Sequence, residues 1–191
     1  MYLWIDLETT GLDPDNDRII EVGWLLSENC VQLTQVQSVL ITPDKVAWEL
    51  MQQDLFVQTM HTNNNLLKDM ETFGSIMVED AEDQILESML PWRDESEIIV
   101  LAGASVHFDR GFIRTWMPRL HRRLMHRHMD VSTLRMFFDD AAFHSYGEKM
   151  RPTVHRALQD VEDAYGLYKR YFELTQELKY ASSMRTDDLD A

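Results

Sequence analysis

The sequence predicts an α/β domain, with a mixed β-sheet and helices on both of its faces. Strand-like segments come first, at residues 2–7, 18–26 and 31–41. Helical and strand-like patterns then alternate, and a long helical pattern at residues 154–180 comes last. This order is typical of a mixed sheet that helices cover on both faces. The 191 residues are enough for one hydrophobic core, and neither a linker nor an internal repeat divides them.

The N-terminal strands are predicted from apolar runs and turn formers. Residues 2–7 are an apolar run with aromatic and β-branched members, which ends before Gly11. Turn-forming residues at 13–17 precede the second strand, and a shorter turn at 27–29 precedes the third. Such short links favour an antiparallel meander of the three strands.

The middle of the chain alternates between helix and strand. Residues 43–68 contain scattered aromatic and apolar positions that hint at short helices. Apolar residues recur at helical spacing over residues 73–90, which predicts an amphipathic helix closed by Pro91. Residues 98–102 are all apolar and predict a short buried strand that ends at Gly103.

Arginines mark the next predicted helix. Residues 108–125 alternate apolar residues and arginines with a helical period, and Pro118 is expected to break or kink this helix. A short last strand is expected at residues 128–131. Ser132 is expected to be the N-cap of a helix at residues 133–143.

The C-terminal part begins with a polar segment at residues 144–153, which is expected to be a loop. The long helix at residues 154–180 follows it. Residues 181–191 are rich in aspartate and are expected to form a frayed tail. We therefore expect one domain at residues 1–180, followed by an acidic tail.

The charge balance limits the choice of partners. The formal net charge is −15, from 18 basic and 33 acidic residues. A protein that follows a long polyanion usually carries a broad basic surface, so this balance disfavours extended DNA or RNA. A short nucleic acid held by a few local contacts and metal ions stays compatible with it. The positive charge is unevenly distributed, because residues 110–127 contain six arginines and no acid. Local contact with a nucleic acid is one explanation of this basic stretch, and a solvated helix face near an acidic surface is the alternative.

Composition also bears on location. The single cysteine, Cys30, excludes an internal disulfide. No apolar run approaches the roughly 20 residues of a membrane span. The first strand carries acids where a signal peptide would continue its apolar core. These features favour a cytoplasmic protein with no membrane partner.

Asp6 and Glu8 interrupt the first predicted strand. Since successive strand side chains point to opposite faces, these two project to the same side. Two adjacent acids at the end of an apolar strand repel each other and are costly to desolvate, so they need a cation or a shared proton. A metal ion is the first hypothesis. The alternative is a solvated strand end whose acids face water.

Two further places combine acids with unusual neighbours. Asp109 lies near the start of a helix, where an acid is favourable in itself. Asp160 lies in an apolar stripe and therefore needs a partner. His155 precedes it by about 140° of helical rotation, so the two side chains meet only if His155 lies in the loop or first turn. A solvent-facing histidine at the helix start is the alternative.

Together these acids and the histidine resemble the DEDDh family of metal-dependent 3′→5′ exonucleases, over residues 2–172. The motifs that carry the resemblance are Asp6-x-Glu8, Asp109 and His155-x₄-Asp160. The match is closer to one branch, the oligoribonucleases, because residues 130–134 (Asp-Val-Ser-Thr-Leu) are not typical of general proofreading exonucleases. The other matching segments are residues 4–8, 10–13, 17–21, 60–62, 101–103, 108–110 and 117–118, with Ser105. The resemblance implies a ribonuclease H-like fold, with a mixed five-stranded sheet flanked by helices.

The resemblance also implies a site for two divalent cations, which would relieve the repulsion between four converging carboxylates and assist an in-line displacement at phosphorus. Asp6, Glu8 and Asp160 would hold one ion. Asp6 would bridge to the second, and Asp109 would contribute directly or through water. His155 would accept a proton from the attacking water. Oxygen ligands favour Mg²⁺ or Mn²⁺.

A further implication is the substrate: very short single-stranded RNA, down to dinucleotides, which would be cut to mononucleotides. Leu12 would be a wedge between the two bases, His61 would pack beside the 3′ base, and Ser105 would contribute to the phosphate site. In oligoribonucleases the 5′ phosphate is capped by residues from the other subunit of a homodimer. The matching residues are Arg127, Ser132 and Thr133. A site closed at its 5′ end selects short substrates and tolerates a net charge of −15.

The sequence departs from this branch near the expected substrate contacts and not at the four acids or His155. The differing positions are Thr9, Ala104, His107, Phe108, Gly111 and His126. Three alternatives therefore stay open. The first is a 3′→5′ exonuclease on longer single-stranded DNA or RNA ends, for proofreading or trimming. The second is an inactive nucleotide-binding module, although such a module has no need of His155, and the third is a plain α/β protein whose acids only decorate the surface.

Overall fold

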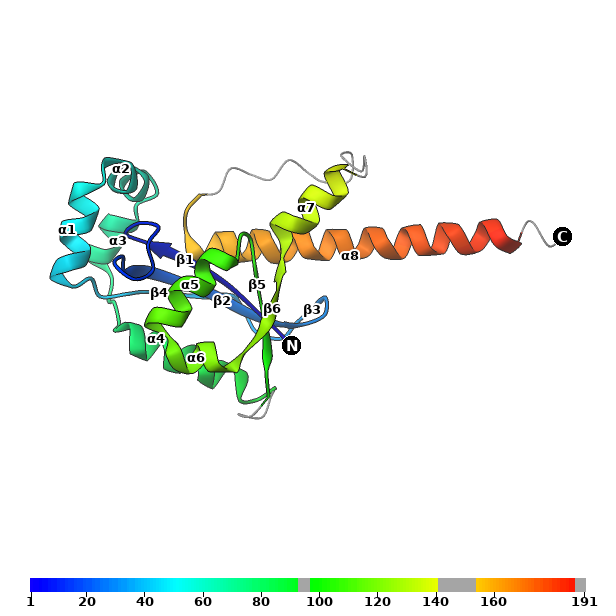
Figure 1. Ribbon diagram of the computed structural model, residues 1–191, viewed down its shortest axis with the longest axis horizontal. Coiled ribbons are helices and arrows are strands. Elements are labelled where there is room, and N and C mark those ends of the chain that lie inside the picture. The colour runs from blue at the N-terminus through cyan, green and yellow to red at the C-terminus, as the bar shows by residue number, and fades with distance from the viewer. Residues whose placement is uncertain (93–96, 141–153, 188–191) are drawn as a thin grey trace.

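The computed structural model describes residues 1–92, 97–140 and 154–187 of the chain. It contains a mixed β-sheet with helices packed on both faces (Figure 1). The last helix extends well beyond the body that the sheet and the other helices form (Figure 1). The predicted α/β class is confirmed.

The sheet combines an antiparallel and a parallel half. Its strands are β1 (Tyr2–Thr9), β2 (Ile19–Glu28), β3 (Val31–Gln32), β4 (Gln37–Leu40), β5 (Ile99–Gly103) and β6 (Leu124–Asp130). Their order in space is β3-β2-β1-β5-β6, and β4 also pairs with β2. β2 is antiparallel to β1, whereas β5 is parallel to β1 and β6 is parallel to β5. The single third strand predicted over residues 31–41 is wrong, because β3 and β4 pair separately with β2.

Eight helices are described around the sheet. They are α1 (Lys45–Gln53), α2 (Leu55–Asn63), α3 (Leu66–Thr72), α4 (Val78–Met89), α5 (His107–Trp116), α6 (Pro118–Arg123), α7 (Val131–Asp140) and α8 (Ala157–Asp187). Pro118 opens α6, so the helix predicted over residues 108–125 is divided at this proline as expected. Asp44 and Asp54 cap α1 and α2, because their carboxylates accept backbone N–H groups of the first turn. None of the described helices is both long and apolar enough to cross a membrane.

The helix predicted over residues 73–90 is too long at its N-terminal end. Its counterpart α4 begins at Val78, because Ile76 instead forms a parallel bridge with Ile41. The Ile76 N–H donates to the Leu40 carbonyl at 3.0 Å. Pairing with this distant strand end prevails over the local helical pattern.

The elements after β5 also differ at their ends. The strand predicted over residues 128–131 is longer, since β6 begins at Leu124. α7 begins at Val131, so Ser132 lies inside the helix and is not its N-cap. The Asp130 carboxylate instead accepts the Ser132 N–H at 2.9 Å.

The C-terminal helix is longer than its apolar pattern. α8 runs from Ala157 to Asp187, so it enters the tail expected over residues 181–191. The remainder of that tail, at residues 188–191, lies outside the described residues. The helix end and polar loop predicted over residues 141–153 lie outside them as well.

The alternation of side chains along β1 divides the core between the two faces of the sheet. The side chains on the face that α4, α5 and α6 cover are those of Leu3, Ile5 and Leu7. Trp4 points to the other face and packs against Tyr165 of α8, with ring centroids 5.5 Å apart. Asp6 and Glu8 follow Trp4 at intervals of two, so they lie on the face that α8 covers.

The start of α8 is fixed closely against β2. A Cβ atom at Gly23 would lie 2.5 Å from the backbone of Ala157, so a larger residue would push α8 away. Gly23 is also the residue of β2 that pairs with Asp6 of β1. The first residues of α8 therefore lie beside the strand that carries the two acids.

Candidate active site

Asp6 and Glu8 lie near the end of β1, on one face of the sheet. Glu8 is only 5% exposed. Burial, followed by the negative charge of Asp160, raises the pKa of Asp6 to about 8. Burial, followed by the charge of Asp6, raises the pKa of Glu8 to about 9. Each carboxylate thus favours a bound proton or a cation.

Asp109 lies in the first turn of α5 and is 3% exposed. Its Oδ1 atom accepts the backbone N–H of Leu7 at 3.0 Å. Since β5 pairs with β1 only as far as Trp4, this carboxylate takes the place of a strand partner for Leu7. Burial, followed by the charge of Asp6, raises the pKa of Asp109 well above its ordinary value.

His155 and Asp160 reach the same place from the start of α8. His155 precedes the helix with a left-handed backbone, at φ 52°, and Asp160 lies in the first turn. Ligand atoms of Glu8, His155 and Asp160 lie within 4.8 Å of one another. Burial raises the pKa of Asp160, and the charge of His155 opposes this in part. The structure therefore has the loop-and-helix arrangement in which these two side chains can meet.

The four carboxylates have the chemistry of a site for divalent cations. Asp6, Glu8 and Asp160 line one cavity. Within the described part of the chain, none of these acids or Asp109 forms an ion pair with lysine or arginine. Carboxylates with raised pKa values and no lysine or arginine partner are stabilised by cations, and oxygen ligands suit hard ions such as Mg²⁺ and Mn²⁺. The residues present therefore fit the divalent cations that the sequence predicts.

A cavity of about 460 Å³ opens over these acids. Its wall adds hydroxyl groups and apolar side chains to the carboxylates and His155. The side chains that matter most for a ligand are those of Leu12, Phe56, Met60, Ser105, Phe108 and Ser132. An acidic floor with apolar walls suits a ligand that has both phosphate groups and flat apolar rings.

Two exposed apolar side chains stand at this cavity. Leu12, in the loop after β1, is 82% exposed, and Phe56, in α2, is 74% exposed. The sequence predicts Leu12 as a site residue. The cavity also contains Phe56, which sequence reasoning missed, and Met60 and Phe108, which it assigned no role in the site. A signal for Phe56 exists, because it stands between Leu55 and Val57 and one helix face cannot bury three consecutive apolar residues.

Ser105 and Ser132 meet at the wall of the cavity. The Ser105 N–H donates to the Ser132 hydroxyl and to the Asp130 carboxylate, both at 3.1 Å. Ser132 thus lines the cavity of its own chain. Arg127 on β6 and Thr133 on α7 are exposed and do not line it. Their contribution to the site of a second subunit stays a prediction.

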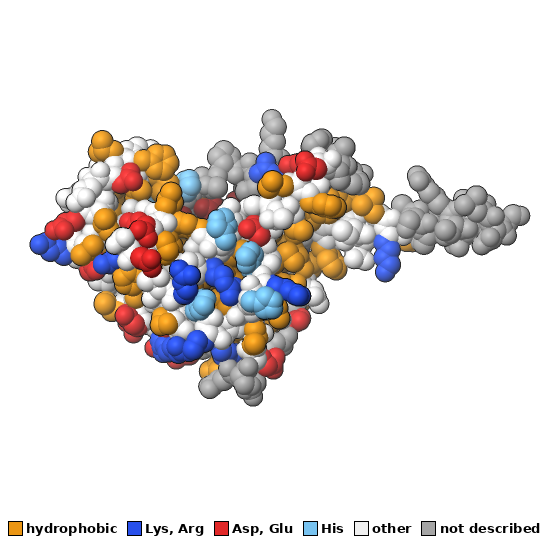
Figure 2. Space-filling model, in the orientation of Figure 1, with side chains coloured by type: hydrophobic (Ala, Val, Ile, Leu, Met, Phe, Trp, Pro, Cys, Tyr) orange, Lys and Arg blue, Asp and Glu red, His pale blue; other side chains and the backbone are white. Residues whose placement is uncertain are grey.

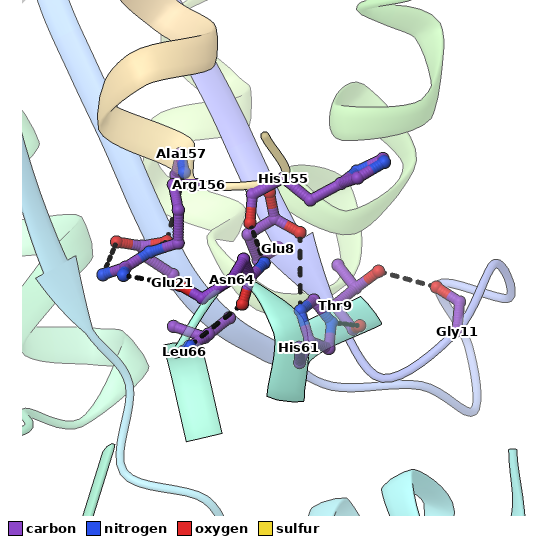
Figure 3. A network of polar contacts seen from close by, with 10 residues as sticks. All are labelled: Glu8, Thr9, Gly11, Glu21, His61, Asn64, Leu66, His155, Arg156 and Ala157. Atoms are coloured by element: carbon purple, nitrogen blue, oxygen red, sulfur yellow. Dashed lines mark hydrogen bonds and ion pairs between the residues drawn. The ribbon is translucent and has the colours of Figure 1, made fainter. Parts of the chain in front are cut away.

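His61 lies beneath the site and not in the cavity. It is fully buried, and its Nε2 atom lies 3.1 Å from the Thr9 carbonyl oxygen (Figure 3). Its Nδ1 atom lies 3.9 Å from a Glu8 carboxylate oxygen. Burial lowers the pKa of His61 and raises that of Glu8, so this contact is between two groups that favour their neutral forms. The expected contact of His61 with a base stays a prediction, and in this structure the ring supports Thr9 and Glu8 instead.

A basic face lies beside the acidic site. Figure 2 shows arginine and histidine side chains interleaved over α5, α6 and β6. Its exposed members include His107, Arg114, Arg122, His126, Arg127 and His128. Burial lowers the pKa of His121, and the positive charges of Arg110 and Arg114 lower it further. The charge of Arg119, on α6, is balanced within the protein, because its Nε atom forms an ion pair with Glu82 at 2.7 Å.

The sequence matches the Exonuclease family (RNase_T) over residues 3–168. The chain belongs to this exonuclease family. The oligoribonuclease of Corynebacterium diphtheriae is 34% identical over 166 residues, which cover 85% of this chain and 77% of that protein. The oligoribonuclease of Coxiella burnetii is 31% identical over 164 residues, which cover 85% of this chain and 87% of that protein. The predicted resemblance to 3′→5′ exonucleases and oligoribonucleases is confirmed.

Solved structures of other nucleases share the fold of this exonuclease. The RNase domain of the yeast Pop2 protein superposes with a TM-score of 0.64, at 14% identity, over 92% of this chain and 77% of that chain. E. coli exonuclease I in complex with a dT13 oligonucleotide gives 0.60 at 15% identity, over 93% of this chain and 43% of that chain. The predicted ribonuclease H-like fold is confirmed.

Proposed function

We propose that this exonuclease is a two-metal-dependent 3′→5′ exoribonuclease that hydrolyses very short oligoribonucleotides, including dinucleotides, to mononucleotides. The observation that carries the proposal is the convergence of Asp6, Glu8 and Asp160 with His155 on the floor of one cavity. Asp109 adds a fourth carboxylate through its contact with β1. The relatives named oligoribonuclease support the choice of substrate.

Asp6, Glu8, Asp109 and Asp160 would hold two Mg²⁺ or Mn²⁺ ions, with Asp6 shared between them. Bound there, the ions would neutralise the converging carboxylates and stabilise charge on the oxygens of the reacting phosphate. Their binding would also explain why buried acids with raised pKa values gather in one place.

His155 is the general base of the proposal. One of its ring nitrogens lies within 4.8 Å of carboxylate oxygens of Glu8 and Asp160, and the His155 side chain is exposed. A histidine there can accept the proton of the attacking water as the water oxygen bonds to phosphorus. The bond from phosphorus to the 3′ oxygen of the preceding nucleotide breaks, which releases the terminal nucleotide with its 5′ phosphate.

The apolar side chains at the cavity would bind the bases. Base rings stack well on exposed aromatic side chains, and Phe56 offers such a ring at the cavity wall. Leu12 stands exposed on the loop after β1, in a position suited to a wedge between two bases. The hydroxyls of Ser105 and Ser132 lie 3.3 Å apart and would contact a phosphate.

Short substrates fit the size and charge of the molecule. The cavity of about 460 Å³ lies in the range of ~300–1,000 Å³ that is usual for small-molecule sites. The net charge of −15 opposes the approach of a long polyanion. We place the enzyme in the cytoplasm, where short RNA fragments arise and where a free cysteine such as Cys30 stays reduced.

A homodimer completes the proposal. β6 is the last strand of the sheet order, and Arg127 of this edge strand is exposed and does not line the cavity of its own chain. In the proposed homodimer, Arg127 and Thr133 would reach the cavity of the second copy and cap a 5′ phosphate there. Ser132 lines the cavity of its own chain, so it would contact the substrate within its own subunit.

One assay tests the proposed substrate. RNA and DNA of two, five and twenty nucleotides, labelled at the 5′ end, are incubated with Mg²⁺ or Mn²⁺. Strong preference for the RNA dinucleotide supports the proposal, and equal or faster cutting of the twenty-mers contradicts it. The absence of cutting in all mixtures would leave a nucleotide-binding module.

A second candidate function is 3′→5′ trimming of longer single-stranded DNA or RNA. The basic face over α5, α6 and β6 favours it, because such a face could guide a backbone toward the cavity (Figure 2). Combined replacement of Arg114 and Arg122 by alanine separates the two candidates. The twenty-mer rate should fall if the face guides a long strand, and dinucleotide hydrolysis should not change.

A further inference from the structure

The backbone of His155 is held in a conformation that a histidine rarely adopts on its own. Its φ angle of 52° lies in the left-handed region, where the Cβ atom of a non-glycine residue is crowded. Such a conformation persists only where the surroundings fix it. The contacts that do so come from α2, α3 and β2.

Asn64 makes the first of these contacts. It is the C-cap of α2, and its side-chain amide donates a hydrogen bond to the His155 carbonyl oxygen (Figure 3). The other end of the same side chain accepts the Leu66 N–H at 2.9 Å. The amide is therefore fixed at both ends between the α2–α3 turn and the loop before α8.

Arg156 makes the second set of contacts. Its guanidinium bridges two acids from different elements: Nε lies 3.2 Å from Glu21 of β2, and Nη1 lies 2.7 Å from Asp69 of α3. Nη1 also donates to the Asn64 carbonyl at 3.3 Å. Glu21 is almost fully buried and accepts the Ala157 N–H at 3.1 Å, which caps the first free donor of α8. The His155 carbonyl and the two residues that follow it are thus held by other elements of the fold.

None of these side chains lines the cavity, so they do not contact a ligand there. Their link to the site runs through the backbone of residues 155–157. If the loop relaxed to an ordinary right-handed or extended conformation, the His155 ring would turn away from Glu8 and Asp160. A shift of about 1 Å in a reacting group can lower a rate by ~10².

We propose that Asn64 and Arg156 are positioning residues that hold the His155 imidazole over the acidic cluster. The inference rests on the proposed role of His155 as general base. It extends the site to the α2–α3 turn, and α2 also carries Phe56 and Met60 in the cavity wall.

Asn64→Asp tests the inference, because it keeps an acceptor for the Leu66 N–H but removes the donor to His155. We expect kcat for the dinucleotide to fall roughly tenfold or more while KM changes less than about twofold, since substrate contacts are unaffected. The matched control is Asn63→Ala, one residue away and exposed at the end of α2. Equal kcat values in the two variants would overturn the proposal, as would a loss confined to KM.

A double-mutant cycle separates positioning from a purely structural role. In the His155→Ala background, Asn64→Asp should cause no further loss of kcat, because the group that Asn64 positions is gone. Losses that multiply would show that Asn64 acts elsewhere. For Arg156, Asp69→Asn removes only one end of the bridge and should give a smaller fall in kcat. Arg156→Gln should give a larger one, with folding checked by circular dichroism because Glu21 loses its buried partner.

A measurement without turnover distinguishes this inference from the proposed function. Histidine ring signals are recorded by NMR while Mn²⁺ is added, and the His155 signal is assigned by its loss in His155→Ala. Broadening of this signal by Mn²⁺ should be strong in the wild-type protein and clearly weaker in Asn64→Asp. Unchanged broadening would overturn the positioning role, even if RNA is cut. Reduced broadening in a protein that cuts no RNA would uphold positioning and contradict the nuclease proposal.

Discussion

The Asp109 carboxylate accepts the Leu7 N–H at 3.0 Å, across 102 positions of sequence. The contact ties the first turn of α5 to the strand segment between Asp6 and Glu8. A hydrogen bond from a backbone N–H normally lowers the pKa of a carboxyl group, yet that of Asp109 is raised because burial and the charge of Asp6 outweigh it. The fold therefore holds Asp109 in a place where burial and the charge of Asp6 destabilise its ionised form.

Asp109→Asn should separate this structural contact from the charge. The amide oxygen can still accept the Leu7 N–H, so the melting temperature should change little. Hydrolysis of the dinucleotide should fall by about 100-fold or more, as is usual when a group that stabilises a transition state is removed. Thermal unfolding and steady-state kinetics check both parts. Full metal-dependent activity in this variant would exclude Asp109 from the site.

The stability of the metal-free protein should fall as pH rises. The pKa values of Asp6 and Glu8 are raised from 3.8 and 4.5 to about 8 and about 9, so the folded state retains protons that the unfolded state has released. This stabilisation is complete below about pH 4 and is lost progressively up to about pH 9. Melting temperatures in EDTA between pH 5 and 9 measure it.

Added Mn²⁺ should reverse that trend. Because the ion binds the ionised carboxylates, its stabilising effect should be larger at pH 8 than at pH 6. Asp6→Asn with Glu8→Gln is the control. It should show a weaker pH dependence, to which Asp109 and Asp160 still contribute, and no response to Mn²⁺. A Mn²⁺ effect that persists in this double variant would place the ion elsewhere.

Gly23→Ala should damage the start of α8. The new Cβ atom would lie 2.5 Å from the Ala157 backbone. Overpacking of this kind costs about 1–3 kcal/mol, and the displaced helix start should also reduce kcat. Gly166→Ala is the matched control, since its Cβ atom meets nothing within 4 Å and alanine favours the helix. A Gly23→Ala variant with wild-type stability would show that α8 can shift freely.

Phe56→Ala should weaken substrate binding. Loss of one base–aromatic stack is worth about 1–3 kcal/mol, so KM for the dinucleotide should rise roughly tenfold with little change in kcat. Leu55→Ala is the control, because Leu55 is exposed beside it and does not line the cavity. Equal KM values for the two variants would remove Phe56 from the substrate site.

Arg127→Ala should act on short substrates selectively. If Arg127 of a second subunit caps the 5′ phosphate, the dinucleotide rate should fall by ~10-fold or more, in line with a charge-assisted contact of about 1.5–3 kcal/mol. The rate on a twenty-mer should change less. Light scattering during size-exclusion chromatography gives the oligomeric state of both proteins. A monomeric wild-type enzyme with full dinucleotide activity would contradict the cap.

The parts that could be predicted from sequence are those that depend on local periodicity. Asp6 and Glu8 share a face because strand side chains alternate, and this holds wherever β1 lies in the sheet. Asp160 stood out because an acid interrupts an apolar helical stripe. Pro118 divides a helix for reasons contained in its own ring. Each of these features is fixed by neighbours within a few residues.

The parts that could not be predicted depend on contacts between distant segments. The bridge between Ile76 and Ile41 shortens α4, although residues 73–77 continue a helical pattern. Arg156 meets Glu21 across 135 positions, and nothing in either neighbourhood indicates it. His61 follows the motif of a base-binding histidine, but its burial depends on how α2 packs against β1.

The candidate active site joins the first strand of the chain to its last helix. Asp6 and Glu8 come from β1, whereas His155 and Asp160 come from the start of α8. The ribosome synthesises a chain from its N-terminus at about 5–20 residues per second, and a domain generally folds as a unit. A nascent chain of this enzyme would therefore lack the proposed general base, His155, and the proposed metal ligand Asp160 until α8 has left the ribosome. On the proposed site assignment, the order of the elements along the chain would keep the nuclease inactive while it is still beside its own messenger RNA.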